Sequence, residues 1–533
     1  MSQPKQPTNT SALATLVIVF FFWGFIAASN SIFIPFCKTH FHLSQFESQL
    51  IGSAFYVAYF AGSLILFLFS NFLGYDILNR IGYKKGIIYG LWISVVGALL
   101  IIPSANANSF PALLVSFFIV ALGFSLQQTA AQPFAITLGD PSTGSHRLNL
   151  GGSVNSLGTT LGPLIVSFFL FGSIGNKVAD VTVTNINNLY LIVAGVFAAV
   201  AMFFTFSKLP DGKNEEKFEK ANKASISLLV MTGAIIAIIV VGQLTEIPKL
   251  TLLIATLIAV VGILFYSNAS AIKNNDGWGA MKYQQLILGM IGIFVYVGVE
   301  VTIDNNFGAL LKIPGYLTEA GLDESQISKY VSLYWGSLMI GRWAGAVSVF
   351  NLTGIKKKIA LIVVPFIAFA VILAVNSIYG NDIKDLLAYG IWVAIAIAAF
   401  FYGQEKPVKT LLTVSVLACI AMLIGVFTNG IVSVYAFMAG GLSCSVMWPC
   451  IFSLGVGGLG KYTSQGSAFL IMMILGGAVI PPLQGAIGDV YGMHQSYLLA
   501  AACFAFLAFL AIKLRGVLKA QGLNFDDQIG GGH

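Results

Sequence analysis

The chain has 533 residues, of which 57% are hydrophobic and 9% charged, and its mean hydropathy is +0.86. Soluble domains carry about 25% charged residues, so this composition excludes a soluble globular protein and predicts an all-α polytopic membrane protein. The formal net charge of +7 is expected to reflect basic cytoplasmic loops, because no basic–aromatic patch indicates a nucleic-acid partner.

Apolar stretches of spanning length recur along the whole chain, and one span needs roughly 20 residues. Six precede a charged linker, KLPDGKNEEKFEKANK, and lie at 13–36, 46–73, 86–103, 110–138, 148–173 and 188–207. Ten follow the linker, at 224–242, 250–266, 284–311, 326–350, 359–378, 386–403, 408–428, 431–456, 462–483 and 496–514. The sequence therefore predicts about 16 spans, although 250–266 and 386–403 are short enough to be re-entrant or interfacial.

The basic residues predict the orientation of these spans. If every stretch crosses once, 22 of the 28 Lys and Arg residues lie on the side of the N-terminus, and cytoplasmic loops are the basic ones. Both termini are therefore expected in the cytoplasm. Six spans, a charged loop and a second set form the layout of transporters built from repeats. The expected domains are a transporter half at 1–208, a linker with an extra helix pair at 209–283, a second half at 284–515 with a helix pair inserted within 359–428, and a tail at 516–533.

The loop after the second stretch reads GYDILNRIGYKKG, residues 74–86. It resembles the loop signature of the major facilitator superfamily, and its expected gating residues are Asn79, Arg80, Gly82 and Lys84. Arg342, which follows Gly341, is a weak echo of this signature in the second half and is expected to take part in gating. A positive-inside anchor is the alternative interpretation of the loop.

Five further stretches carry a more specific resemblance: SAFYVAYF (53–60), QTAAQPF (128–134), GSHRLNLGGSVNSLG (144–158), WPCIFSLG (448–455) and LGKYTSQGSAF (459–469). Together they look like the fucose:proton symporter branch of that superfamily. The resemblance implies a major facilitator fold of two six-helix halves, here with about four extra helices. It also implies a secondary transporter of the bacterial cytoplasmic (inner) membrane.

The chain departs from this branch where its proton-coupled members carry acids. An Asp of the first span is matched by Ser31, and a Glu of the fourth span is matched by Gln128. An Asn of the same motif becomes Gln132, and a Gln of the fifth span becomes Gly152. Serine and glutamine cannot titrate, so the proton relay that the resemblance implies for the first half is missing.

The stretch 284–311 carries two acids, Glu300 and Asp304, well inside an apolar sequence. Four residues apart, they lie on one helical face, and burying a carboxylate in hydrocarbon costs about 2.5–3.5 kcal/mol. We expect a water-accessible centre in which the pair shares a proton or binds sodium. The alternatives are that the acids pair with Arg342 or face the outer vestibule. The lead-in Tyr296-Val297-Gly298 resembles the glucose/galactose-type members of the branch, which carry a Glu here.

Uncharged polar side chains suit a sugar, because an amide offers both a donor and an acceptor to hydroxyl groups. The expected ligands are Asn30, Gln127, Gln128, Gln132 and Asn155, with Trp335 and Trp448 as stacking surfaces. Interhelical hydrogen bonds between amides are the alternative.

The sequence therefore predicts a secondary active transporter that imports a monosaccharide or amino sugar, coupled to H⁺ or Na⁺ through Glu300. A uniporter or exchanger without ion coupling, and a transporter-like sensor or scaffold, remain alternatives. The expected partners are the sugar and membrane lipid. No C-x-x-C pair, H-E-x-x-H or G-x-S-x-G motif is present, so we expect no zinc site, no cofactor and no enzymatic activity.

Overall fold

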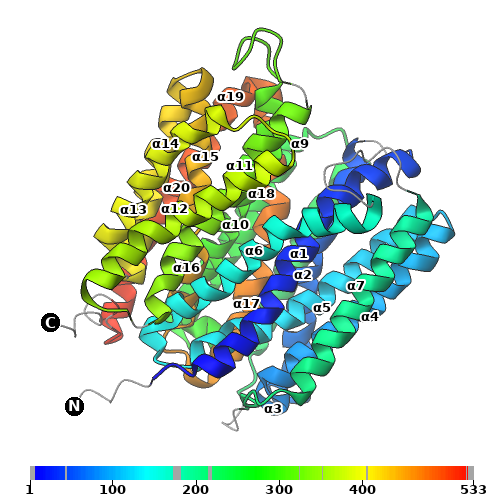
Figure 1. Cartoon of the computed structure of the whole chain (residues 1–533). Coiled ribbons are helices and arrows are strands. Elements are labelled where there is room, and N and C mark those ends of the chain that lie inside the picture. The colour runs from blue at the N-terminus through cyan, green and yellow to red at the C-terminus, as the bar shows by residue number, and fades with distance from the viewer. Residues whose placement is uncertain are drawn as a thin grey trace.

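The computed structural model describes residues 7–42, 45–171, 182–213, 219–322, 324–350, 352–403, 406–523 and 525. Within these ranges every regular element is a helix, and the long helices run side by side in one bundle (Figure 1). Helix α1 begins with Thr10 and helix α20 ends with Ala520 at the same end of the bundle. We call this the terminal end and the opposite one the distal end.

The first group of helices comes from the first 206 residues. Its members are α1 (Thr10–His40), α2 (Gln45–Leu73), α3 (Ile77–Ile81), α4 (Tyr83–Asn106), α5 (Phe110–Thr137), η1 (Pro141–Thr143), α6 (Gly144–Phe171) and α7 (Val183–Phe206). Helix α4 packs between α5 and α7, α1 packs on α6, and α2 packs on α5. We call these helices the N group.

The second group repeats this arrangement. Its members are α10 (Gln284–Leu311), α11 (Glu324–Ala346), η4 (Val347–Phe350), α14 (Pro407–Phe427), α15 (Gly430–Cys444), α16 (Met447–Val456), η6 (Gly460–Tyr462), α17 (Thr463–Met472), η7 (Met473–Leu475), α18 (Gly476–Tyr491), α19 (Met493–Ser496) and α20 (Leu498–Ala520). Helix α14 packs on α15 and α20, as α4 packs on α5 and α7. We call these helices the C group.

Two helix pairs stand outside this repeat. They are α8 (Asn222–Leu244) with α9 (Lys249–Lys273) and η3 (Gly279–Lys282), and α12 (Gly354–Ile378) with η5 (Lys384–Tyr389) and α13 (Gly390–Gly403). Since α14 takes the place of a repeat helix, the inserted pair is α12 and α13. The two stretches that seemed short, 250–266 and 386–403, lie inside helical segments of 25 and 20 residues.

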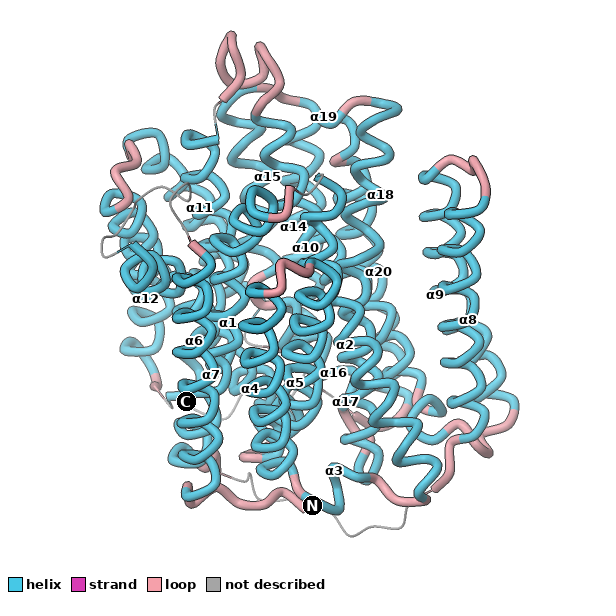
Figure 2. The backbone as a smooth tube through the Cα atoms, turned by 90° about the vertical axis from the view of Figure 1, so that its right-hand side faces the viewer, coloured by secondary structure: helices cyan, strands magenta, loops and turns pink. Residues whose placement is uncertain are grey.

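Helices α8 and α9 stand at the edge of the bundle (Figure 2). Only 28% and 22% of their apolar windows are buried. The backbone N–H of Ala221, before α8, donates to Asn71 Oδ1 on α2 at 2.7 Å. After α9, the backbone N–H of Ala280 donates to Gln465 Oε1 on α17. This pair is therefore fixed to both groups at the terminal end.

Thirteen helical segments among the described residues are long and apolar enough to cross a membrane. Helices α1, α6 and α11 are the other long helices, and they make up the difference from the predicted count. Helix α6 is rich in small polar residues, as its sequence GSHRLNLGGSVNSLGTT shows. The count of 16 spans stays a prediction.

Helix α10 lies at the centre of the C group, and 94% of its apolar window is buried. Glycines allow its neighbour α18 to approach: a Cβ atom built on Gly298 would lie 2.3 Å from Ile480 Cδ1, and one built on Gly476 would lie 1.8 Å from the carbonyl oxygen of Phe294. Because the second contact is to backbone, no side-chain rotation relieves it.

The substitution Gly476→Ala is expected to lower the thermal unfolding midpoint of the protein in detergent. Overpacking typically costs about 1–3 kcal/mol, and here α10 and α18 must move apart. The control is Gly262→Ala on α9, where a Cβ atom meets nothing within 4 Å and helix propensity favours alanine. Equal midpoints for the two variants would contradict the packing argument.

Candidate functional site

The two groups meet along α6 and α11, where each helix places a polar side chain over a glycine of the other. A Cβ atom on Gly152 of α6 would lie 3.1 Å from Arg342 Cδ, and one on Gly345 of α11 would lie 2.6 Å from Asn149 Cγ. The missing side chain at position 152 thus makes room for the arginine.

Glu300 is a buried carboxylate whose direct partners, Tyr296 and Arg342, belong to the C group. Tyr296 Oη, one turn earlier on α10, donates a hydrogen bond to Glu300 Oε1 at 2.7 Å. Arg342 Nη2 lies 3.5 Å from the same oxygen, and its Nη1 donates to Ser156 Oγ on α6 at 3.0 Å. One guanidinium therefore balances the carboxylate of the C group and is also bonded to the N group.

Asp304 has different neighbours, one turn further toward the distal end. The indole of Trp335 of α11 interacts with its carboxylate. Its Oδ1 atom is buried and has no hydrogen-bond partner among the described residues. A buried acceptor without a donor costs about 1–3 kcal/mol, so this oxygen is a place for a water molecule, a proton or a cation.

The amides predicted to bind sugar have different roles. Gln128 Nε2 donates to Tyr59 Oη at 2.9 Å, and Asn155 Nδ2 donates to the Phe20 carbonyl at 3.0 Å, while the Gln132 Oε1 atom is buried without a partner among the described residues. Gln127 is used at both ends inside the N group, since it accepts from Trp23 Nε1 at 2.9 Å and donates to Ser94 Oγ at 3.1 Å. It has the interhelical role and offers nothing to a substrate in this structure.

The three remaining predicted ligands, Trp448, Trp335 and Asn30, have different surroundings. Trp448 of α16 faces Tyr296, with ring centroids 6.2 Å apart, and stacks on Phe452. Trp335 is 37% exposed and contacts Asp304. Asn30 belongs to α1, but its side chain lies outside the described residues.

The sequence predictions missed three side chains at this centre. Ser156 holds the arginine, and Tyr59 holds Gln128. Tyr56 of α2 interacts electrostatically with both Glu300 and Asp304. The two tyrosines are three residues apart, which places them on one helical face, and this spacing in SAFYVAYF could have identified them.

The loop 74–86 joins the groups at the terminal end. Asn79 Nδ2 donates to the Lys461 carbonyl at 3.2 Å, and Asp76 Oδ1 accepts from Ser464 Oγ at 3.0 Å. Arg80 lies over the Tyr75 ring, so it stays within its own group. Lys84 also contacts its own group, since its Nζ atom donates to the Ser207 carbonyl at 2.8 Å. Gly82 forms the turn between α3 and α4 with a φ of 90°. Arg342 lies in the interior with Glu300 and not in this contact.

Other contacts close the terminal end further. Ser467 Oγ donates to the Thr129 carbonyl at 2.9 Å, and the Phe67 and Phe469 rings meet edge to face at 4.7 Å. Trp343 Nε1 donates to the Ser153 carbonyl at 3.3 Å. Among the described residues, the hydrogen bonds between the groups come from the terminal half or the middle of their helices.

The linker adds an ionic contact to this closure. Lys461 Nζ lies 2.7 Å from Glu219 Oε1, Lys282 Nζ lies 3.7 Å from Oε2, and Tyr462 Oη donates to Oε2. Hydrogen bonds from Lys461 and Tyr462 lower the pKa of Glu219 to about 2. Glu219 thus stays ionised at every physiological pH.

Comparison with known proteins gives relatives along nearly the whole chain. The model of the Major Facilitator Superfamily matches residues 15–407. A glucose/galactose transporter of Brucella abortus biovar 1 (strain 9-941) is 30% identical, and the match covers 94% of this chain and 93% of the relative. The L-fucose-proton symporter of Escherichia coli (strain K12) is 26% identical, with 93% and 92% covered.

Solved structures agree in fold. A crystal structure of the E. coli fucose:proton symporter matches with a TM-score of 0.63 and 21% identity, covering 94% of this chain and 98% of that one. A major facilitator transporter crystallised in the outward conformation matches with the same TM-score and coverage and 22% identity. At this identity the likeness shows a common all-helical fold.

The Glu219 contact predicts a specific pH dependence of stability. A folded pKa below the unfolded value of about 4.3 contributes stability above that value, and this contribution is lost as the pH falls toward 2. The difference in unfolding midpoint between the wild type and Glu219→Gln should therefore be constant from pH 8 to pH 5 and shrink below pH 4. Since the side chain is 54% exposed, the difference should be small, under about 1 kcal/mol.

The measurement is thermal unfolding in detergent across this pH series. Glu246→Gln, in the exposed loop between α8 and α9, is the control for removing one acid. A difference that changed between pH 8 and pH 6 would show that Glu219 is not held ionised by its partners.

Proposed function

The chain belongs to the major facilitator superfamily, and from that premise we propose that it imports a monosaccharide or amino sugar by alternating access. Relatives named as glucose/galactose transporters and L-fucose-proton symporters support a sugar as the cargo. The family and these relatives make the protein a transporter and not an enzyme.

The membrane placement follows the basic residues. The terminal end is the cytoplasmic one, the helices make 16 spans, and the membrane is the bacterial inner membrane. The excess of Lys and Arg on this side supports the orientation, and the bacterial source of the relatives supports the compartment. The contacts that close the terminal end then correspond to an outward-facing state, in which sugar enters from outside.

The sugar site lies between the groups near the middle of the bundle. Gln128, Gln132 and Asn155 supply amide donors and acceptors from the N group, and Trp448 supplies a ring from the C group. The unpartnered Gln132 Oε1 supports this assignment, because a sugar hydroxyl would satisfy it. The site carries no acid from the N group, since Gln128 and Ser31 stand at the positions of the acids.

Coupling is assigned to Glu300, and one observation carries it: Arg342 links this carboxylate to Ser156 of the other group. A proton or sodium ion on Glu300 neutralises it and removes the attraction for Arg342. The charge of Glu300 then controls how strongly Arg342 is held by α6. Asp304, with its unpartnered Oδ1, is the second candidate ligand for the cation.

The runner-up is a uniporter or exchanger. Arg342 already balances the charge of Glu300 at 3.5 Å. A carrier of this design can therefore change between its outward- and inward-facing states without a bound cation. A sensor or scaffold, the third possibility, would bind sugar without measurable flux.

The first test is sugar uptake into proteoliposomes under a sodium gradient and, separately, under a proton gradient. The wild type should accumulate sugar under one of them. Glu300→Gln should lose accumulation at least tenfold and keep sugar exchange, because the amide cannot release or bind the cation. Glu246→Gln is the matched control. Equilibration without accumulation would replace the symporter with a uniporter, and absence of flux for every sugar would leave the sensor.

The second test is a double-variant cycle on the Glu300–Arg342 pair. Glu300→Gln leaves Arg342, a partly buried charge, without its counter-ion, which is destabilising, whereas Glu300→Gln with Arg342→Gln removes both charges. The double variant should therefore have a higher unfolding midpoint than Glu300→Gln alone. Arg342→Gln alone should lower the half-saturating concentration of the coupling cation several-fold, since the competing positive charge is gone. Additive midpoints would show that the two residues do not interact.

A further inference from the structure

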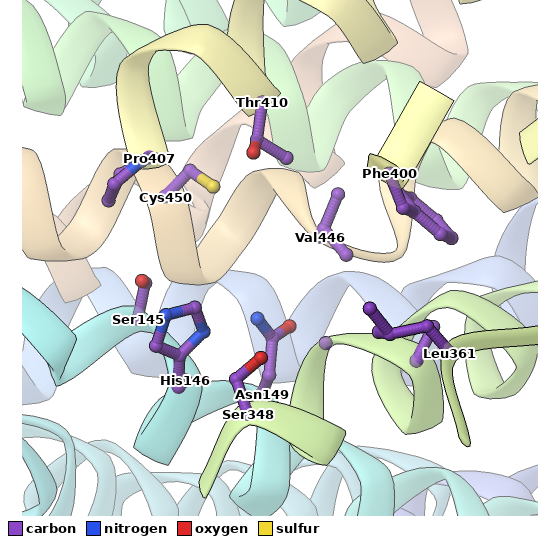
Figure 3. A pocket seen from close by; sticks show the side chains of 12 residues that line it. Ser145, His146, Asn149, Ser348, Leu361, Phe400, Pro407, Thr410, Val446 and Cys450 are labelled. Atoms are coloured by element: carbon purple, nitrogen blue, oxygen red, sulfur yellow. The ribbon is translucent and has the colours of Figure 1, made fainter. Parts of the chain in front are cut away.

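A pocket lies at the terminal end, away from the carboxylates and between the two groups. Figure 3 shows two rows of side chains that face each other across it. Ser145, His146 and Asn149 of α6 form one wall, and Val446 and Cys450 with the first turns of α14 form the opposite one.

The chemistry of the lining points to a neutral ligand with several hydroxyl groups. Five of the twelve lining residues offer a hydroxyl, amide or imidazole: Ser145, His146, Asn149, Ser348 and Thr410. None of the twelve is Asp, Glu, Lys or Arg, so no carboxylate, ammonium or guanidinium group in the lining would balance the charge of an ionic ligand. Phe400 supplies an aromatic ring to its wall.

Asn149 gives the second, independent observation. Its side chain is 4% exposed, and its Oδ1 atom has no hydrogen-bond partner among the described residues. The amide points into the pocket (Figure 3), past Gly345, where a Cβ atom would lie 2.6 Å from Asn149 Cγ. A buried acceptor of this kind is satisfied by a donor from a ligand.

We propose that this pocket is a second sugar site, open toward the cytoplasm, which binds sugar that has already been released. The identity of the ligand rests on the proposed function, because the carried sugar is then the neutral polyhydroxy molecule that accumulates on this side. The pocket itself rests on its geometry and chemistry alone.

Occupancy of this site holds the terminal end closed. Ser145, His146 and Asn149 belong to the N group, and the other nine lining residues belong to the C group and the inserted pair. These two sets of lining residues therefore separate when this end opens. A ligand that binds one state stabilises it by RT ln(1 + [L]/Kd) and shifts the population toward it. Accumulated sugar therefore slows opening to the cytoplasm, and the product restrains its own import.

The inserted pair has a role in this arrangement. Leu361 of α12 and Phe400 of α13 line the pocket, and both helices lie outside the repeat of the two groups. They supply part of the wall of a site that two six-helix groups alone would leave incomplete.

The binding test uses the full-length protein in detergent with the central site disabled by Gln128→Ala and Asn155→Ala. D-glucose and D-galactose are the probes, and ligand-observed NMR measures their binding. Binding should persist, and adding Thr410→Val or Ser348→Ala should weaken it at least tenfold. The matched control is Thr413→Val, on the same helix, whose hydroxyl donates to the Lys409 carbonyl and does not line the pocket.

The conformational test follows the distance between spin labels at Thr137 and Lys356, exposed residues at the terminal ends of the N group and of α12. Cys419, the native cysteine that is not buried, is replaced by serine in this background. Sugar should shift the centrally disabled protein toward the shorter distance, and Thr410→Val should abolish the shift.

Absence of residual binding, residual binding that Thr410→Val and Ser348→Ala leave unchanged, or an unchanged label distance would each overturn the proposal. The failure of the proposed function is distinguishable. Wild-type protein that carries no sugar, together with residual binding that depends on Thr410, removes the import function and keeps the site. Accumulation of sugar by the wild type, together with no residual binding in the centrally disabled protein, keeps the import function and removes the second site.

Discussion

The structure depends on one partly buried arginine that is shared between two groups of helices. Arg342 extends from α11 over Gly152 of α6, with Glu300 on one side and Ser156 on the other. A charge at this depth is costly without partners, so its position fixes the spacing of α6 and α11. The glycine at 152 is the sequence change that makes this possible, because a longer side chain there would occupy the space of the guanidinium.

The sequence predicted the all-helical fold, which the family and the structure confirm. It also singled out Glu300, whose coupling role stays a prediction, because both features leave strong local signals. An acid inside an apolar stretch is visible without any knowledge of its neighbours. Arg342 was predicted as a gating residue, with pairing to the acids as the alternative, and the structure places it beside Glu300. Its contact with Ser156 is not visible in the sequence, because only the packing of α6 against α11 brings the two residues together.

Adjacent residues of the same type on one helix can have different hydrogen-bond partners, which the sequence does not distinguish. Gln127 and Gln128 are chemically identical, but they point about 100° apart around α5. Gln127 faces Trp23 and Ser94 inside the N group, while Gln128 faces Tyr59. The pocket at the terminal end could not be predicted either, because residues from 145 to 450 converge on it and no single stretch carries its pattern.

The anchoring of α8 and α9 has a mechanical consequence. The groups touch along two seams. The first joins α2 and α5 to α17, and α2 also to α18; the second joins α6 to α11 and α16. The α8–α9 pair is hydrogen-bonded to Asn71 of α2 and to Gln465 of α17. It therefore links the two groups across the first seam only. When the two groups rotate against each other, this link keeps the axis of rotation near the first seam. The same rotation then displaces the α6–α11 seam further. Rocking of the two groups would therefore change distances more across the α6–α11 seam than across the α2–α17 seam, and pairs of spin labels placed across each seam would report this inequality.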